Sequence, residues 1–284
     1  MGGIYASVLT ISPGRPFRAS VTTFGALVWS GFRRYATYRR ATLAGAFTNT
    51  VFGVIRVSIF FAAADAAGGS VAGYDRAALS TYTWIGQGMI AVVWLFAWTP
   101  VTQRVRSGDV AIDLGRPVHP IAAWLAEDVG RAGQACLIRF IGPLLIGGLL
   151  YGLQVPTRWT TVPLFVLSGA LAVVVSFGGR ILVSLLAFWL VDVRGVLTLY
   201  VLTSSVLCGL LVPVHFLPGW AQAIAYATPF PSMLQVPLDM ATERYDELAS
   251  VGLLAMQAAW AAGLLAVAVV VFGRGTRKLV LQGG

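Results

Sequence analysis

Charged residues are scarce in this chain. Asp, Glu, Lys and Arg make up 11% of its 284 residues, whereas they make up ~25% of an average soluble domain. Apolar residues reach 57%. A water-soluble fold of this length needs more polar groups to cover its surface. The composition therefore excludes an ordinary soluble protein and favours a membrane protein.

Groups that catalyse reactions or hold cofactors are also few. The only histidines, His119 and His215, lie far apart and outside any metal-ligand spacing. Lys278 is the only lysine, and its surroundings do not match the phosphate loop GxxxxGK[ST]. Cys136 and Cys208 lie inside apolar runs, which indicates core residues and neither a disulfide nor a metal pair. We therefore predict no catalytic residue and no metal site in this chain.

Two further features exclude other classes. The first fifteen residues hold an apolar stretch without a preceding positive charge or an evident cleavage site, so we expect an amphipathic segment and no cleaved signal peptide. An acid–base pair for a membrane enzyme is not evident either. The carboxylates near residue 243 have the pattern of a solvated helix start; they are Asp239, Glu243, Asp246 and Glu247.

Long apolar runs are abundant. About twenty apolar residues cross the hydrocarbon core as a helix. Six runs are of about that length or longer: 43–64, 82–101, 135–153, 162–191, 196–216 and 251–272. We interpret 162–191 as one tilted or kinked helix loosened at Gly178-Gly179. The sequence thus predicts an all-α membrane protein with six transmembrane helices over residues 42–273, a cytoplasmic or interfacial segment 1–41, and a tail 274–284.

The cations orient this layout. Lys and Arg concentrate in cytoplasmic loops. With the N-terminus inside, the inner side carries Arg15, Arg18, Arg33, Arg34, Arg39, Arg40, Arg104, Arg106, Arg116, Arg131, Arg194, Arg274, Arg277 and Lys278, and the outer side carries Arg76, Arg158 and Arg244. Both termini are therefore expected in the cytoplasm. The net charge of +9 lies between apolar runs, so anionic lipids and not nucleic acid are the expected counter-charge. The arginine bias is also typical of a GC-rich bacterial genome.

Three connections have a character of their own. The segment 32–40 (FRRYATYRR) interleaves arginine pairs with aromatics, which fits either an interfacial helix or a simple positive flank. The inner loop 104–130 has mixed charges. The outer stretch 215–249 is broken by prolines but rich in aromatics, and we predict short helices that dip back into the outer leaflet.

The inner loop and the tail resemble a known family. Residues 105–117 read VRSGDVAIDLGRP, 124–130 read WLAEDVG, and the chain ends RKLVLQGG. This arrangement resembles the ABC-2-type exporter permeases, and more narrowly their six-span subfamily linked to drug and viologen export. The stretches LPGW at 217–220 and PFP at 229–231 are similar to the family's external segment before the last helix. The resemblance covers nearly the whole chain.

The resemblance implies a role for the inner loop. In this family a short cytoplasmic helix between spans 2 and 3 couples to a separate ATPase. Asp109 and Asp113 lie four apart and can share one helix face, Pro117 would end that helix, and Trp124 offers an apolar anchor. The expected coupling residues are Arg104, Arg106, Asp109, Asp113, Arg116, Trp124, Glu127 and Asp128. The other interpretation of the pattern is an ordinary solvated loop that caps helices.

Other candidates lie in the membrane and at its outer side. Arg56 and Arg180 fall in mid-span, where a charge is costly, so they are expected to line a pathway, to pair across an interface, or to have a structural partner. Arg139 lies nearer the inner boundary. Trp94 and Trp98 fit an apolar lining, or else core or lipid-facing positions. Trp220, Tyr226 and Phe230 are the candidates for an external gate.

The resemblance further implies the assembly. Two ATPase copies would carry ATP and magnesium, and a second permease, related or identical, would complete the membrane domain in the inner membrane of a bacterial cell. The substrate would be a small lipophilic or drug-like molecule. Two alternatives stay open: an ATP-independent channel or secondary transporter, which would need a carboxylate pair or His relay within the spans, and a membrane scaffold without transport.

Overall fold

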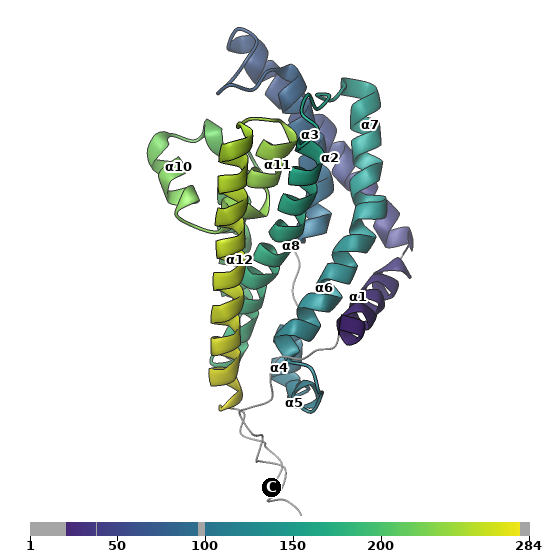
Figure 1. The fold of residues 1–284 in the computed structure, drawn as a ribbon, viewed down its shortest axis with the longest axis vertical. Helices are drawn as coiled ribbons and strands as arrows, with labels where there is room; N and C mark the ends of the chain where they lie inside the picture. Colours follow the sequence, from purple (N-terminus) through teal and green to yellow (C-terminus); the bar gives the residue numbers. More distant parts are fainter. Residues whose placement is uncertain (1–20, 38, 96–99, 279–284) are drawn as a thin grey trace, which may run out of the picture.

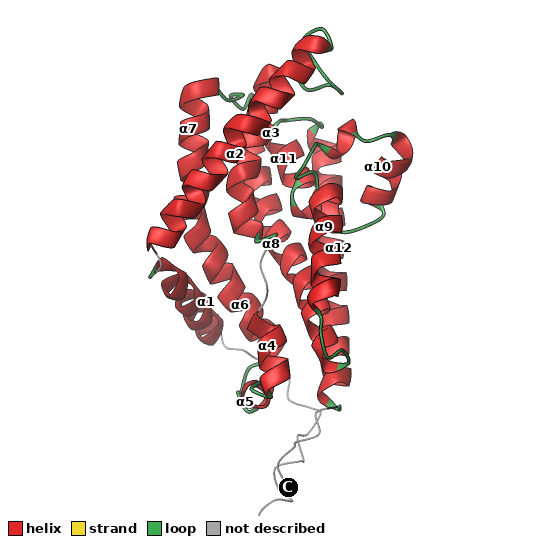
Figure 2. Ribbon diagram, turned by 180° about the vertical axis from the view of Figure 1, so that it is seen from behind, coloured by secondary structure: helices red, strands yellow, loops and turns green. Residues whose placement is uncertain are grey.

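The chain is a bundle of helices whose long members run along one axis. The computed structural model describes residues 21–37, 39–95 and 100–278, and within them it contains no β-strand. Segments distant in sequence lie side by side, with α8 against α12 and α1 against α6 (Figures 1 and 2). The prediction of an all-α fold is thus confirmed for the part of the chain that is described.

The helical elements follow in chain order. They are α1 (Val21–Ala36), α2 (Arg39–Ala66), α3 (Arg76–Val93), α4 (Pro100–Ser107), α5 (Val110–Leu114), α6 (Pro120–Ala135), a π-helical turn (Cys136–Phe140), α7 (Ile141–Tyr151), α8 (Thr161–Leu185), a 3₁₀ turn (Leu186–Phe188), α9 (Arg194–Leu207), a 3₁₀ turn (Val214–Phe216), α10 (Gly219–Tyr226), a 3₁₀ turn (Phe230–Met233), α11 (Gln235–Ala241) and α12 (Glu247–Thr276).

Four helical stretches are long and apolar enough to cross a membrane. Among the described residues these are Leu43–Ala66, Pro120–Tyr151, Thr161–Phe188 and Glu247–Thr276. They contain or closely match four of the six expected runs. The six-span layout itself stays a prediction, because the expected second and fifth runs have a different form.

The expected second run, 82–101, is not one helix in the part that is described. Helix α3 ends at Val93, and Trp94 follows in the left-handed conformation with φ 57°. Helix α3 is buried on nearly all sides and carries Ser80, Thr83 and Gln87 inside the bundle. Because neighbouring helices enclose α3, these polar side chains are accommodated inside the bundle.

The expected fifth run, 196–216, is also shorter as a helix. Helix α9 ends at Leu207, and Gly209 follows with φ 85°. A side chain at Gly209 would lie 2.6 Å from the hydroxyl of Tyr82, so both the backbone angle and the space require glycine there. The turn at Gly209 brings residues 210–217 back into the bundle.

The third and fourth expected runs are helical, and the third starts earlier in the chain than expected. The third begins at Pro120 and not near residue 135, and a π-helical turn at Cys136–Phe140 precedes Pro143. A proline removes one helical hydrogen bond and collides with the carbonyl four residues earlier, which the wider turn accommodates. The fourth is one helix from Thr161 to Leu185, as interpreted, and the helix continues through Gly178-Gly179 without a break.

These two glycines serve close packing instead. A side-chain carbon on Gly178 would lie 2.7 Å from Leu264 of α12, and one on Gly179 would collide with Tyr200 of α9. Small residues allow membrane helices to approach closely. The pair therefore fixes α8 against its neighbours without breaking it.

Helix α1 also packs by glycine contact. A side chain on Gly31 would collide with the carbonyl of Glu127, and one on Gly130 with the carbonyl of Val28, so the backbones of α1 and α6 touch reciprocally. The segment 32–40 is not one interfacial helix, because α1 ends at Ala36 and α2 begins at Arg39. The amphipathic stretch expected within the first fifteen residues lies outside the described residues.

The short helices gather at opposite ends of the bundle. Helices α4 and α5 lie at the lower end in Figure 1, beside the last turns of α12, whereas α10 and α11 lie in the upper half. The expected short helices in 215–249 are therefore present as α10 and α11.

Candidate functional site

At the lower end, α4 and α5 form a helical hairpin that ion pairs between its own residues stabilise. Gly108, with φ 82°, turns the chain between α4 and α5. The buried carboxylate of Asp113 accepts a hydrogen bond from Nη2 of Arg104 at 2.7 Å and lies 3.4 Å from Nη1 of Arg116. A charge-assisted contact with a buried acid is stronger than an exposed pair. The hairpin is thus a compact element at the end of the bundle, where Val105 and Val110 pack into the core and other residues stay exposed.

The hairpin differs from its sequence-based description. Asp109 is exposed and accepts a hydrogen bond from the Ser107 hydroxyl at 2.7 Å, whereas Asp113 points inward, so the two acids do not share an exposed face. Helix α5 ends at Leu114, before Pro117. Its exposed large apolar residue is Ile112, which is 63% exposed and which no sequence pattern singles out.

Two expected contact residues turn inward. Trp124 is 7% exposed and packs edge-on against Phe272 of α12, with ring centroids 5.6 Å apart. Asp128 is buried as well. We therefore correct their assignment: they hold the lower end of the bundle together and are not presented to a partner. Arg106 and Asp109 are exposed, Arg116 is largely exposed, and Glu127 is half-buried.

A buried ion cluster ties three helices together above the hairpin. Asp128 of α6 accepts hydrogen bonds from Nε of Arg131 at 2.8 Å and from Nη2 of Arg180 of α8 at 2.7 Å. Arg131 also donates to the carbonyls of Ala91 at 2.8 Å and Val92 at 2.7 Å, at the C-terminal end of α3. These carbonyls lack helical partners and carry the negative end of the helix dipole, so a cation suits them.

Trp94 completes this cluster. The guanidinium carbon of Arg131 lies 4.5 Å from one of its ring centroids, and that of Arg180 lies 5.3 Å away. Both contacts are within the range of a cation–π interaction. Arg180 is therefore paired within the chain, and Trp94 faces the two cations. Trp98 lies outside the described residues.

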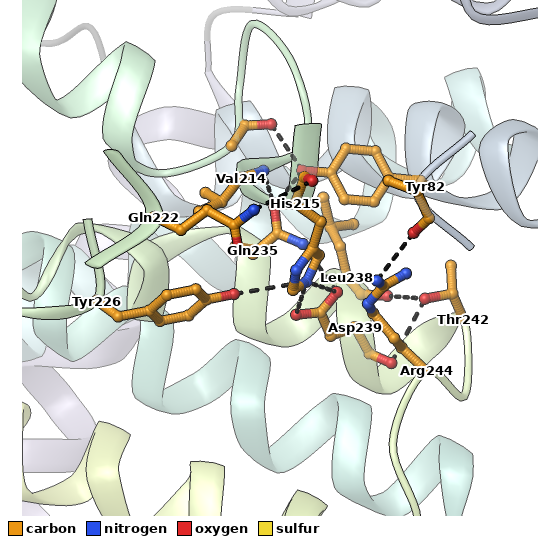
Figure 3. A network of polar contacts seen from close by, with 12 residues as sticks. Tyr82, Val214, His215, Gln222, Tyr226, Gln235, Leu238, Asp239, Thr242 and Arg244 are labelled. Atoms are coloured by element: carbon orange, nitrogen blue, oxygen red, sulfur yellow. Dashed lines mark hydrogen bonds and ion pairs between the residues drawn. The ribbon is translucent and has the colours of Figure 1, made fainter. Parts of the chain in front are cut away.

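The upper half contains a second buried polar network, centred on Asp239 of α11 (Figure 3). Asp239 is 2% exposed and accepts hydrogen bonds from Tyr74 at 3.0 Å and from Gln235 at 2.8 Å. The Nε2 atom of His215 lies 3.1 Å from its second oxygen. Asp239 therefore does not belong to a solvated helix start, and that interpretation of it is wrong.

Gln235 extends the network to the turn after α9. Its Oε1 accepts hydrogen bonds from the Tyr82 hydroxyl and from the backbone N–H of Val214, both at 2.8 Å. Tyr82 also contacts the carbonyl of Gly209 at 2.7 Å. A single buried amide thus fixes α3, α11 and the turn at Gly209. Neither Gln235 nor Asp239 carries a sequence signal that would reveal these partners.

The expected gate residues take different positions. Tyr226 points its hydroxyl toward His215 at 3.5 Å, at the edge of the network (Figure 3). Phe230 packs against Tyr200, with ring centroids 5.8 Å apart. Trp220 of α10 is 71% exposed. The structure brings Tyr226 to the outer network but leaves Trp220 at the surface.

The loop after α11 is anchored by one carboxylate. Glu243, with φ 51°, accepts hydrogen bonds from the hydroxyls of Thr157 and Thr161 and from the backbone N–H of Arg158 at 2.9 Å. Burial by itself would raise the pKa of Glu243, but these hydrogen bonds outweigh it and lower the pKa to about 2. Asp246 caps α12 by accepting a hydrogen bond from the N–H of Ala249 at 2.8 Å, which fits the expected helix start.

The described residues contain no group of three His, Cys, Asp or Glu side chains that could hold a metal ion. Arg56 of α2 is half-buried and has no hydrogen-bond partner for Nε and Nη2. Among the described residues, the pairs around Asp128 thus join helices, whereas Arg56 forms no ion pair.

Long apolar helices, glycine-mediated packing and buried ion pairs define a multi-pass helical membrane protein. The family model described as "ABC-2 family transporter protein" matches residues 48–283, most of the chain. The chain belongs to this family of transport subunits. Comparison with curated proteins finds no match, and neither does comparison with solved structures.

Proposed function

We propose that the chain is the permease subunit of an ATP-driven exporter that moves a lipophilic or drug-like molecule out of a bacterial cell. The observation that carries the proposal is the α4–α5 hairpin, which lies at one end of the bundle and exposes Arg106, Asp109 and Ile112. A rigid short helix with exposed charges around an apolar residue suits docking in a groove of a soluble partner.

The partner would be an ATP-binding-cassette ATPase in two copies, which would carry ATP and magnesium. Two permease chains, identical or related, would form the complete membrane domain. Both termini would lie in the cytoplasm of the bacterial inner membrane, as the arginine distribution requires. The order α2, α3–α4, α6–α7, α8, α9 and α12 supports six crossings. Helices α3 and α9 are shorter than the other four: α3 is buried among its neighbours, and α9 is followed by the turn at Gly209.

The ion cluster supports a route for the coupling. Helix α4 contacts α8, and the Asp128 ion pairs join α6, α8 and the end of α3. A push of the ATPase on the hairpin would therefore move three helices as a unit. At the far end, the network around Asp239 joins α3 and α11 and would have to rearrange when solute leaves.

One observation favours the rival class of a proton-coupled transporter. Asp239 and His215 form a buried pair of a carboxylate and an imidazole, which such a transporter would need. Asp128 is also buried in a long apolar helix, but its two arginine partners hold it as a fixed charge. Sensitivity of transport to an uncoupler, without any ATPase requirement, would identify the rival.

The test is recovery of the ATPase with the tagged chain from native membranes. We expect the wild-type chain to retain an ABC ATPase and a second permease, and Ile112→Glu to lower ATPase recovery by about tenfold, the loss of ~1.4 kcal/mol from one anchor. Arg33→Gln, at an exposed arginine of α1, is the matched control and should retain the ATPase. If no ATPase accompanies the wild-type chain, the exporter proposal fails.

A further inference from the structure

Arg56 lies in the middle of a membrane-spanning helix without a partner of opposite charge. It is about 20 Å along α2 from Leu43 and about 15 Å from Ala66, at 1.5 Å per residue. Its side chain is half-buried, and Nε and Nη2 are buried without a hydrogen bond. The only ring near its guanidinium carbon is that of Phe60, with the centroid 5.5 Å away.

The depth of Arg56 excludes solvation of its guanidinium by the lipid headgroups. A side chain near a boundary can extend to the headgroups. Arg139 can do so, because it lies against Gly45 near the start of the first span. Arg56 is near the centre of a hydrocarbon core of ~30 Å and cannot reach either boundary. Its charge must be compensated where it lies.

The chain itself supplies no anion for this purpose. All eleven acidic residues lie in the described part, and none contacts Arg56. The ionisable groups within electrostatic range are the phenol of Tyr82 and the thiol of Cys208, both neutral at pH 7. Asp65, the acid nearest in sequence, is nine positions further along α2 and pairs with Arg76. A second, identical copy of this chain would bring the same acids at the same depths, so it supplies no anion either; a related permease with an acid at this depth is the alternative that the interface control below tests.

The surroundings of Arg56 suit an apolar body attached to an anion. Phe52 and Ile59 lie four positions before and three positions after it, on the same helix face, and are 57% and 59% exposed. A bilayer lipid keeps its headgroup at the boundary, about 15 Å from this depth. The anion that reaches Arg56 must therefore belong to a molecule that passes through the protein.

We infer that Arg56 binds the anionic group of the transported molecule, so that the substrates are lipophilic anions, with a carboxylate or phosphate on an apolar body. This inference rests on the proposed export function and narrows its substrate class. We do not expect a lipophilic cation as a substrate, because an uncompensated arginine at mid-span would repel it.

Photolabelling in a defined bilayer tests the inference. The chain is purified with its partners into discs of phosphatidylcholine, and two probes are compared: palmitate with a diazirine in its chain, and hexadecyltrimethylammonium with the same diazirine. We expect palmitate to label α2 peptides around Arg56 and excess palmitate to suppress this. Labelling should fall about tenfold in Arg56→Gln, the loss of one charge-assisted contact, and largely survive in Arg56→Lys.

The controls separate the alternatives. Arg139→Gln, the matched arginine near the boundary, should label as the wild type does. Equal labelling by the cationic probe, or labelling that survives in Arg56→Gln, would overturn the inference. So would suppression by added phosphatidylglycerol, which would assign the site to a resident lipid, or loss of the second permease in Arg56→Gln, which would assign Arg56 to the subunit interface. ATPase recovery is measured on the same samples, so the export proposal can fail independently.

Discussion

Arg180 and Arg56 look alike in the sequence, since each is a single arginine in a long apolar run, yet their surroundings are opposite. Arg180 meets Asp128 at 2.7 Å and stacks near Trp94, in a cluster that joins α3, α6 and α8. Arg56 has no ionic partner at all. The same residue type therefore serves structure at one site and is available to a ligand at the other. Measurements of stability distinguish these two roles.

The largest effect is expected at the acid that holds the Arg180 cluster. Asp128→Asn leaves two buried arginines without a counter-charge and should lower the free energy of unfolding by about 3–5 kcal/mol. Denaturant unfolding of the purified chain in detergent measures this. Glu127→Gln, at the adjacent half-buried acid, is the control and should change stability by less than about 1 kcal/mol. A small effect of Asp128→Asn would mean that the cluster is not formed.

Arg56 should respond in the opposite direction. Arg56→Leu removes an uncompensated charge from mid-span and should raise stability by about 2–3 kcal/mol in the absence of ligand. Arg56→Lys keeps the charge and should leave stability near that of the wild type. The same unfolding measurement applies. If Arg56→Leu destabilises the chain, Arg56 has an internal partner and the contrast with Arg180 is lost.

Trp94 tests how much of the cluster depends on cation–π contacts. Trp94→Leu removes the ring that faces Arg131 and Arg180 and should cost about 1–2 kcal/mol. Trp94→Phe retains an aromatic face and should lose less. Equal losses in the two variants would show that Trp94 contributes through its volume alone.

The smallest expected effect is on the pH dependence of stability, through the hydrogen-bonded carboxylate of Glu243 outside the spans. Because hydrogen bonds lower the pKa of Glu243 to about 2, below its ordinary value, its contribution is fully present above pH ~4.5 and is lost as pH falls through 2. The thermal midpoint should therefore fall with acidification in this window. Glu243→Gln should reduce the dependence on pH, and an unchanged profile would contradict the anchoring role.

Only part of the candidate site could be predicted from the sequence. The loop 104–130, predicted as the coupling element, forms the α4–α5 hairpin and the start of α6, and Arg106 and Asp109 are exposed there. Trp124 was expected to be a surface anchor, but it packs against Phe272, almost 150 positions later in the chain. The apolar residue that is exposed, Ile112, looks like any core residue in a sequence.

The outer network shows the same limit. Asp239 lies close in sequence to Glu243 and Asp246, and the three acids look equivalent. Their surroundings differ because Tyr74 and His215 reach Asp239, threonines reach Glu243, and Asp246 caps a helix. For Asp239 and Glu243 these partners lie between 24 and 165 positions away, and no local pattern encodes them.

The sequence by itself determined the class of protein, since its composition forces apolar surface toward lipid and an apolar run of about twenty residues must be helical there to satisfy its backbone. Its ordered motifs also determined the family. Only the tertiary structure decided which charges are paired. Whether an arginine in an apolar helix has a counter-ion depends on contacts across helices, which is why Arg180 and Arg56 could not be told apart until the helices were packed.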